Sequence, residues 1–182
     1  FIAQAPVALA SCADCLRWYD AYRAAGLSPR RPGPGDLMLA VTDAAIAAQN
    51  AVVAAQSLGL GSCYIGDIME RYEDQRKLLH LPPWVFPACM LVLGWPTQQQ
   101  KERKKPERFD QSFIVHENGY RRLDVAALRT MFRDRCGGQT FEGFLSAFCH
   151  RKYESDFSRE MSRSVGEYLQ DLERVEELAT EK

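Results

Sequence analysis

An alanine-rich stretch over residues 41–67 constrains the fold of this chain more than any other part. Over its helical part, residues 41–57, the strongly polar positions are few, and most of the others are alanine with scattered isoleucine and valine. Small side chains let other backbones approach a helix closely, and a helix that is apolar all round is normally buried. The stretch therefore predicts a central helix inside the core or in a subunit interface. The polar positions are Asp43, Gln49, Asn50 and Gln56.

A glycine turn follows the helix. Gly59 and Gly61 lie on either side of Leu60, and this spacing predicts a left-handed helix end followed by a sharp reversal. Residues 62–65 then favour a short β-strand that stops at Gly66. A glycine there lets a flat or anionic ligand lie against the main chain, although the same residue could simply end the strand.

Hydrophobic periodicity and turn residues divide the rest of the chain. The run Val85–Gly94, bounded by proline and glycine, predicts a fully buried central strand. The other strands we expect are a buried strand over 5–10 and a short strand over 113–116. The other helices we expect cover 14–25, 70–79, 125–135, 141–153 and 156–178. We also expect Asp36 to cap the alanine-rich helix.

Composition limits the class of protein. The 182 residues fit one ordinary domain, and 46% hydrophobic with 26% charged residues are values of a globular protein. A net charge of −1 argues against a nucleic-acid binder that works by general electrostatics. Asp, Gln or Pro interrupts the apolar runs before the length of a membrane span, and no signal pattern is visible, so we expect a cytoplasmic protein without a membrane partner.

Cys12 and Cys15 form a Cys-x-x-Cys pair between a predicted strand and a predicted helix. A thioredoxin-type redox motif occupies such a position, because the start of a helix favours the thiolate. No tryptophan lies just ahead of the pair, and no suitably spaced histidine completes a zinc site. We expect a structural junction and no metal, with redox use of the pair as an alternative.

Two basic segments are candidate anion sites. Arg30 and Arg31 lie in a loop rich in proline and glycine, and a longer basic cluster occupies residues 97–108. Either segment could be a solvated loop or could meet an anionic ligand.

Four segments in order carry a family resemblance: AAIAAQNAVVAAQSLGLGSCYIGDI from Ala44, LLHLPPWVFPACMLVLGWP from Leu78, KERKKPERF from Lys101 and IVHENGY from Ile114. They resemble the FMN-dependent nitroreductase family over most of residues 5–124. The resemblance implies an α+β fold of three-layer α/β/α type, with a mixed, largely antiparallel sheet around the central alanine-rich helix. It also implies a homodimer with FMN at the subunit interface.

The resemblance implies two segments. Residues 1–123 correspond to the FMN-binding core, without the family's N-terminal portion and its Arg-Ser-x-Arg motif. Residues 124–182 correspond to a helical C-terminal extension that packs on the core or on the partner subunit.

The resemblance further implies an NAD(P)H-dependent oxidoreductase. Hydride would pass from NAD(P)H through flavin N5 to a nitroaromatic, quinone or similar small acceptor by a ping-pong mechanism. Because the flavin carries the chemistry, no catalytic side chain is expected. Whether NADH or NADPH is preferred, and which acceptor is physiological, stay open.

The family pattern also assigns site residues. Main-chain N–H groups of the segment Tyr64, Ile65, Gly66 and Asp67 would line the ring edge, and we expect the Asp67 carboxylate to turn away from the ring. Arg108, with Arg103 or Lys105, would grip the FMN phosphate. The segment reads Lys-Pro-Glu-Arg, one residue longer than the common form, so Lys104 is a further candidate.

Two other functions stay open. A thiol-disulfide oxidoreductase would use Cys12 and Cys15, and a non-catalytic module would bind flavin without reducing it. His116, in the VHEN turn, is expected to have a structural role.

Overall fold

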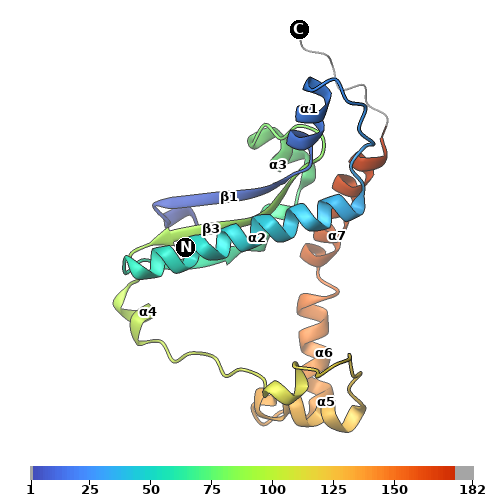
Figure 1. The fold of residues 1–182 in the computed structure, drawn as a ribbon. Helices are drawn as coiled ribbons and strands as arrows, with labels where there is room; N and C mark the ends of the chain where they lie inside the picture. The colour runs from blue at the N-terminus through green and yellow to red at the C-terminus, as the bar shows by residue number, and fades with distance from the viewer. Residues whose placement is uncertain (1, 175–182) are drawn as a thin grey trace. The chain divides into compact units, whose positions relative to one another are not determined.

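The computed structural model describes residues 2–174 and divides the chain into two compact units (Figure 1). The first unit holds the chain up to Thr97 together with the chain from Arg159 onward, and the second holds Gln98–Ser158. This division does not coincide with the expected segments 1–123 and 124–182, because the C-terminal helix packs with the first unit. As a functional division those two segments stay a prediction.

The first unit contains an antiparallel sheet in the order β1-β3-β2. Its strands are β1 (Val7–Asp14), β2 (Gly61–Ile65) and β3 (Val85–Gly94). The predicted central strand is confirmed, since β3 pairs with both neighbours and buries Leu91 almost completely.

The first strand differs from the expectation. It runs four residues further than predicted, to Asp14, and its first half is exposed because β1 lies at the edge of the sheet. Its pairing with β3 shifts between Ser11 and Cys12, where it passes Pro87, a residue that has no N–H to donate to the ladder.

The alanine-rich helix is α2 (Pro34–Ser57). It starts at Pro34, which has the fixed φ angle that suits a first helical position. Asp36 accepts a hydrogen bond from the Gly33 N–H at 2.8 Å, so it caps the helix from within the first turn and not from the cap position itself.

The predicted glycine turn is confirmed at the other end of α2. Gly59 has φ +75°, and the N–H groups of Gly59 and Leu60 donate to the carbonyls of Gln56 and Ala55 at 3.0 and 2.9 Å. This paired pattern is the Schellman motif, and it directs the chain into β2.

The alanine-rich helix was predicted to lie inside the core or in a subunit interface. The core of this chain covers only part of α2, and its burial in an interface stays a prediction. The helix lies along the sheet (Figure 1), and its buried residues are Leu37, Ala48 and Ala55. A sheet can cover only one side of a helix, so the other side stays open. The large apolar side chains on that side are at least 58% exposed: Met38, Leu39, Ile46 and Val53.

Helix α2 also corrects the expectation that no apolar run is long enough to span a membrane. Within the described residues it is the one helix that passes a test of length and composition for a span. Core helices of soluble proteins pass the same test, so this property alone does not place the chain in a membrane.

The core of the first unit gathers aromatic side chains from several elements. The helices α1 (Leu16–Ala24), α3 (Tyr72–Leu78) and α7 (Asp156–Glu173) contribute to it, together with the short 3-10 turn η2 (Gly66–Met69). Another 3-10 turn, η1 (Ile2–Gln4), buries no residue. Tyr168 of α7 makes edge-to-face contacts with Tyr72 and Phe86 at centroid distances of 4.5 and 5.0 Å. Such pairs add to the burial of apolar area, so α7 is an integral part of this unit.

The second unit contains helices α4 (Gln98–Glu102), α5 (Val125–Phe132) and α6 (Phe141–Lys152) and the turns η3 (Gln111–Phe113) and η4 (Arg133–Cys136). A small aromatic cluster holds it together, with Phe132 in contact with Phe109, Phe141 and Phe144. The helices expected over 125–135 and 141–153 are present, the first ending in η4. The last four residues of the helix expected over 156–178 lie outside the described residues, and the described part is α7, which ends at Glu173.

The strand expected over 113–116 is wrong. The carboxylate of Asp110 accepts hydrogen bonds from both the N–H and the hydroxyl of Ser112, at 2.9 and 2.6 Å. These local bonds stabilise the short 3-10 turn η3. The N–H groups of Ile114 and Val115 then donate back to the carbonyl of Gln111, at 3.0 and 2.8 Å, so the chain turns where a strand was expected.

Candidate functional site

The segment Tyr64–Asp67 lies where the chain leaves the sheet. Ile65, the last residue of β2, pairs with Met90 and is 5% exposed. Gly66 then starts η2, and both Gly66 and Asp67 are exposed. The sheet thus anchors one end of this turn and leaves its main chain accessible to a ligand.

Gly66 is not required by the fold. A Cβ atom built on it meets only the flexible end of Met69, at 3.8 Å, and its φ angle is one that other residues adopt. Space beside the main chain at this position is therefore open, which suits the close approach of a flat ligand.

Tyr64 is held by a residue for which we predicted no role in the site. Its hydroxyl donates to Oε1 of Gln49 on α2 at 3.2 Å, although the side chain is 43% exposed. A polar residue on an otherwise apolar helix was the signal that could have identified Gln49. The bond ties β2 to α2 beside the turn.

Acidic side chains gather at the end of the same turn. Burial raises the pKa of Glu70, and the nearby carboxylates of Asp67 and Glu160 raise it further. Arg71 lowers the pKa of Glu70 in the opposite direction, and Arg163 holds the Glu160 carboxylate, so these charges are partly balanced and the main-chain N–H groups are the donors that the turn offers to a ligand.

The basic residues Arg103, Lys105 and Arg108 lie in an exposed, extended segment of the second unit. Lys104 pairs with Glu107 at 3.8 Å, whereas Arg103 and Lys105 form no ion pair within the described residues. The pairing of Lys104 makes it the weaker candidate for a phosphate contact.

Arg108 lines a cavity of about 450 Å³ in the second unit. Arg135 also lines it, with its guanidinium over the ring of Phe109 at 3.9 Å and a hydrogen bond to the Glu107 carbonyl at 3.0 Å. These contacts fix the chain on both sides of Arg108 and leave its own side chain exposed.

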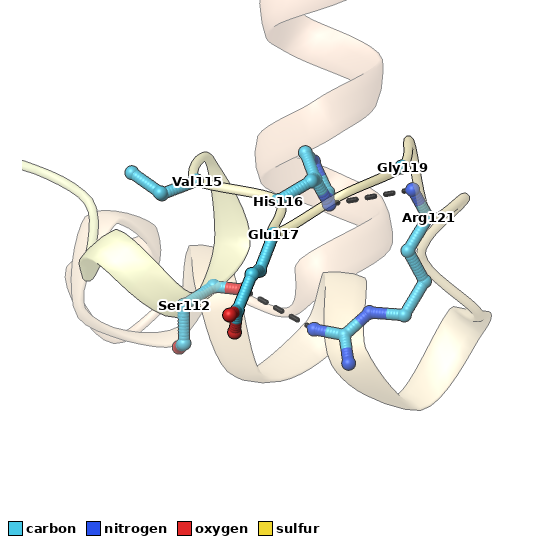
Figure 2. Close-up of a pocket in the computed structure, with 6 residues that line it drawn as sticks. All are labelled: Ser112, Val115, His116, Glu117, Gly119 and Arg121. Atoms are coloured by element: carbon cyan, nitrogen blue, oxygen red, sulfur yellow. Dashed lines mark hydrogen bonds between the residues drawn. The ribbon is translucent and has the colours of Figure 1, made fainter.

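A second cavity of the same unit, of about 290 Å³, surrounds His116 (Figure 2). Nδ1 of His116 accepts from the main-chain N–H of Arg121 at 3.4 Å, and the Arg121 guanidinium donates to the carbonyl of Ser112 at 3.4 Å. Both bonds close the loop on itself, in agreement with the structural role expected for His116.

Arg30 and Arg31 are engaged within the protein. The guanidinium of Arg30 holds both carboxylate oxygens of Asp36 at 2.6 and 3.0 Å, and Arg31 donates to the carbonyl of Arg174 at 3.3 Å. The interpretation of this loop as an anion site is therefore not supported.

Cys12 and Cys15 lack the surroundings of a reactive pair. Burial raises the pKa of both thiols, and the neighbouring carboxylates, Asp14 for Cys12 and Asp36 for Cys15, raise it further. A reactive cysteine needs a lowered pKa, so the structural junction is the better interpretation. Among residues 2–174 no cluster of three or more His, Cys, Asp or Glu is placed to hold a metal ion.

Comparisons with known proteins agree on one family. The profile described as "Nitroreductase family" matches residues 1–95. The chain is 46% identical over 92 residues to oxygen-insensitive NADPH nitroreductase of Salmonella typhimurium, covering 50% of this chain and 37% of the relative. It is 30% identical over 174 residues to FMN reductase [NAD(P)H] of Bacillus subtilis, covering 94% and 66%.

A solved structure supports the fold over most of the chain. NfrA2 of B. megaterium superposes with a TM-score of 0.69 at 28% identity, covering 91% of this chain and 69% of the other. The chain spans between about a third and two thirds of the length of the first curated relatives. The α+β fold is thus shared, and the chain belongs to the nitroreductase family.

Proposed function

We propose that this chain forms an FMN-dependent oxidoreductase that transfers hydride from NAD(P)H to a small acceptor such as a nitroaromatic or a quinone. Membership of the nitroreductase family supports this proposal, as do the relatives named as an NADPH nitroreductase and an FMN reductase. The order of events would be ping-pong, with NAD(P)H leaving before the acceptor enters. The protein would work in the cytoplasm.

The observation that carries the proposal is the turn at Gly66. The fold leaves space beside its main chain and does not require the glycine. Tyr64, Ile65, Gly66 and Asp67 would hold the edge of the flavin ring. Ile65 anchors the segment in the sheet, and the first N–H groups of a helical turn have no partner within it.

The phosphate of FMN would bind to Arg108 together with Arg103 or Lys105. An exposed arginine beside a chain segment fixed by Arg135 can offer its planar donors bidentately. The residues proposed for the phosphate belong to the second unit, and those proposed for the ring belong to the first.

When bound, FMN supplies the hydride chemistry, so the protein needs no nucleophile or metal of its own. The role of the chain is to bind and orient the ring and to present N–H donors where negative charge develops on reduction. The Asp67 carboxylate would have to point away from the ring, because like charge would oppose reduction.

The working form would be a homodimer. The exposed apolar side chains of α2 support this, because a second copy would cover them.

The absorbance spectrum of the purified protein, before and after anaerobic addition of NADPH, tests the proposal. A flavin spectrum that bleaches with NADPH and recovers with a quinone is the expected result. A flavin spectrum that does not bleach would indicate a binding module, and a colourless protein would contradict the proposal. Cys15→Ser serves as a control, since it would abolish a thiol-disulfide activity and leave flavin reduction intact.

A further inference from the structure

Ser164 of α7 is a fully buried hydroxyl that the proposed reaction does not use. Its exposure is 0%, and its Oγ donates to the carbonyl of Met69 at 2.7 Å. Met69 is the last residue of η2, the turn that starts at Gly66. The hydrogen bond therefore joins the C-terminal helix to the end of the turn that we assign to the flavin ring.

Glu160 lies one helical turn before Ser164 and binds the next part of the same chain segment. Its Oε1 accepts from the N–H of Arg71 at 3.2 Å. Arg71 has φ 56° and ψ 58°, a left-handed conformation that is costly for a residue with a side chain. A tertiary contact at its N–H helps to hold that conformation.

An ion-pair network fixes the Glu160 carboxylate. Arg163 donates to both of its oxygens at 2.8 Å and also to both oxygens of Glu73, on the first turn of α3, at 2.9 Å. A single exposed ion pair contributes little to stability, but two bidentate contacts to one guanidinium hold the Glu160 carboxylate in one orientation.

The contact residues of α7 share one face of the helix. Glu160, Ser164 and Tyr168 are four residues apart, and this spacing places them in a row. The sheet pins the start of the turn through Ile65, and this row of α7 pins its end through Met69 and Arg71. The turn therefore has two independent anchors.

We propose that Ser164, supported by Glu160, is a positioning residue that sets the main-chain geometry of the turn Gly66–Met69 for flavin. The inference rests on the proposed function, because the turn matters to the reaction only where FMN binds it. Changes in α7 would then alter the affinity for FMN and the reduction potential although no residue of α7 is assigned to FMN.

The test compares Ser164→Ala with Ser57→Ala. The control removes a hydroxyl that bonds only to the carbonyl of Ala54 in its own helix, at 2.7 Å.

In protein without FMN, we expect the amides of residues 66–71 to exchange hydrogen roughly tenfold faster in Ser164→Ala, as the loss of one hydrogen bond implies. The amides of β3 should be unchanged. With FMN added, Ser164→Ala should bind several-fold more weakly and show a shifted midpoint potential, and Ser57→Ala should match the wild type.

Other results would overturn the inference. Unchanged exchange at residues 66–71 would show that Ser164 does not hold the turn, and faster exchange with unchanged FMN affinity and potential would show that the anchor does not serve the flavin. Wild-type protein that takes up no FMN would refute the proposed function itself, and the exchange data would still report whether α7 anchors the turn.

If Ser164→Ala folds poorly, Glu160→Gln gives a second measurement. It keeps an acceptor for the Arg71 N–H but weakens the pair with Arg163, so a smaller change in the same direction is expected.

Discussion

The hydroxyl of Tyr72 donates a 2.6 Å hydrogen bond to Oδ2 of Asp171, and this bond joins α3 to α7 inside the core. Arg76 donates to the same oxygen at 2.7 Å, and the indole N–H of Trp84 donates to the Asp171 carbonyl at 3.0 Å. Trp84 has φ 65°, which is unusual for a bulky residue. Tertiary contacts to one residue of α7 therefore help to fix the chain from α3 to the start of β3.

Removal of the Asp171 carboxylate should strongly destabilise the protein. Asp171 is 7% exposed, and Asp171→Ala would leave the partly buried Arg76 charge without this partner. We expect a loss of about 3 kcal/mol in the free energy of unfolding, measured by urea denaturation. The control Asp43→Ala changes an exposed residue of α2 and should stay within about 0.5 kcal/mol of the wild type. An equal effect of both changes would contradict the role of Asp171.

Stability should fall at alkaline pH because of two buried tyrosines. Burial raises the pKa of Tyr72 to about 12, with the hydrogen bond to Asp171 as the next cause, and burial raises the pKa of Tyr168 to about 12. A group whose pKa is raised on folding stabilises the protein fully below its unfolded pKa, near 10, and loses this contribution as pH rises to about 12. The midpoint of thermal unfolding should therefore drop between about pH 10 and 12, and Tyr72→Phe should flatten the drop.

The Asp36 carboxyl should titrate at unusually low pH. The hydrogen bond from Arg30, followed by that from the Gly33 N–H, lowers the pKa of Asp36 to about 2. Its small stabilising contribution is present above the ordinary pKa of 3.8 and is lost as pH falls toward 2. NMR titration should show the pKa of Asp36 rising toward its ordinary value in Arg30→Gln and staying low in Arg31→Gln.

Gly66→Ala should separate stability from cofactor binding. The added methyl group has room in the fold, so the free energy of unfolding should change by less than about 0.5 kcal/mol. The same methyl would stand between the main chain and the ring, so affinity for FMN should fall roughly tenfold, measured by quenching of flavin fluorescence. Gly35→Ala, which also meets open space, is the matched control and should keep full affinity. Unaltered affinity in Gly66→Ala would place the ring elsewhere.

Arg108→Gln should weaken FMN binding without affecting the fold. Loss of charge-assisted hydrogen bonds to a phosphate should raise the dissociation constant of FMN about 10- to 100-fold. Riboflavin, which lacks the phosphate, should bind the variant and the wild type equally. Arg122→Gln removes the same charge from an exposed position of the same unit and should leave FMN binding unchanged. A similar loss in both variants would indicate a general electrostatic effect.

Local patterns predicted much of the secondary structure for identifiable reasons. The strand Val85–Gly94 is continuous, apolar and bounded by helix-incompatible residues, and the turn at Gly59 depends on one residue that tolerates positive φ. The strand expected over 113–116 failed because the Asp110 side chain competes for the backbone two residues on. Such a side-chain bond is hard to weigh against β-propensity from sequence alone.

The sequence by itself determined the family and the order of most elements, because these depend on short-range spacing of small and apolar residues. The flavin contact of the segment at Gly66 stays a prediction. Only the tertiary structure decided which polar residues matter to that segment. The contacts of Gln49 with Tyr64 and of Ser164 with Met69 join residues 15 and 95 positions apart. It also decided that Arg30 neutralises Asp36 and that α2 keeps an open apolar side. The contacts of Gln49 with Tyr64 and of Ser164 with Met69 arise from packing between separate elements, and no local pattern encodes them.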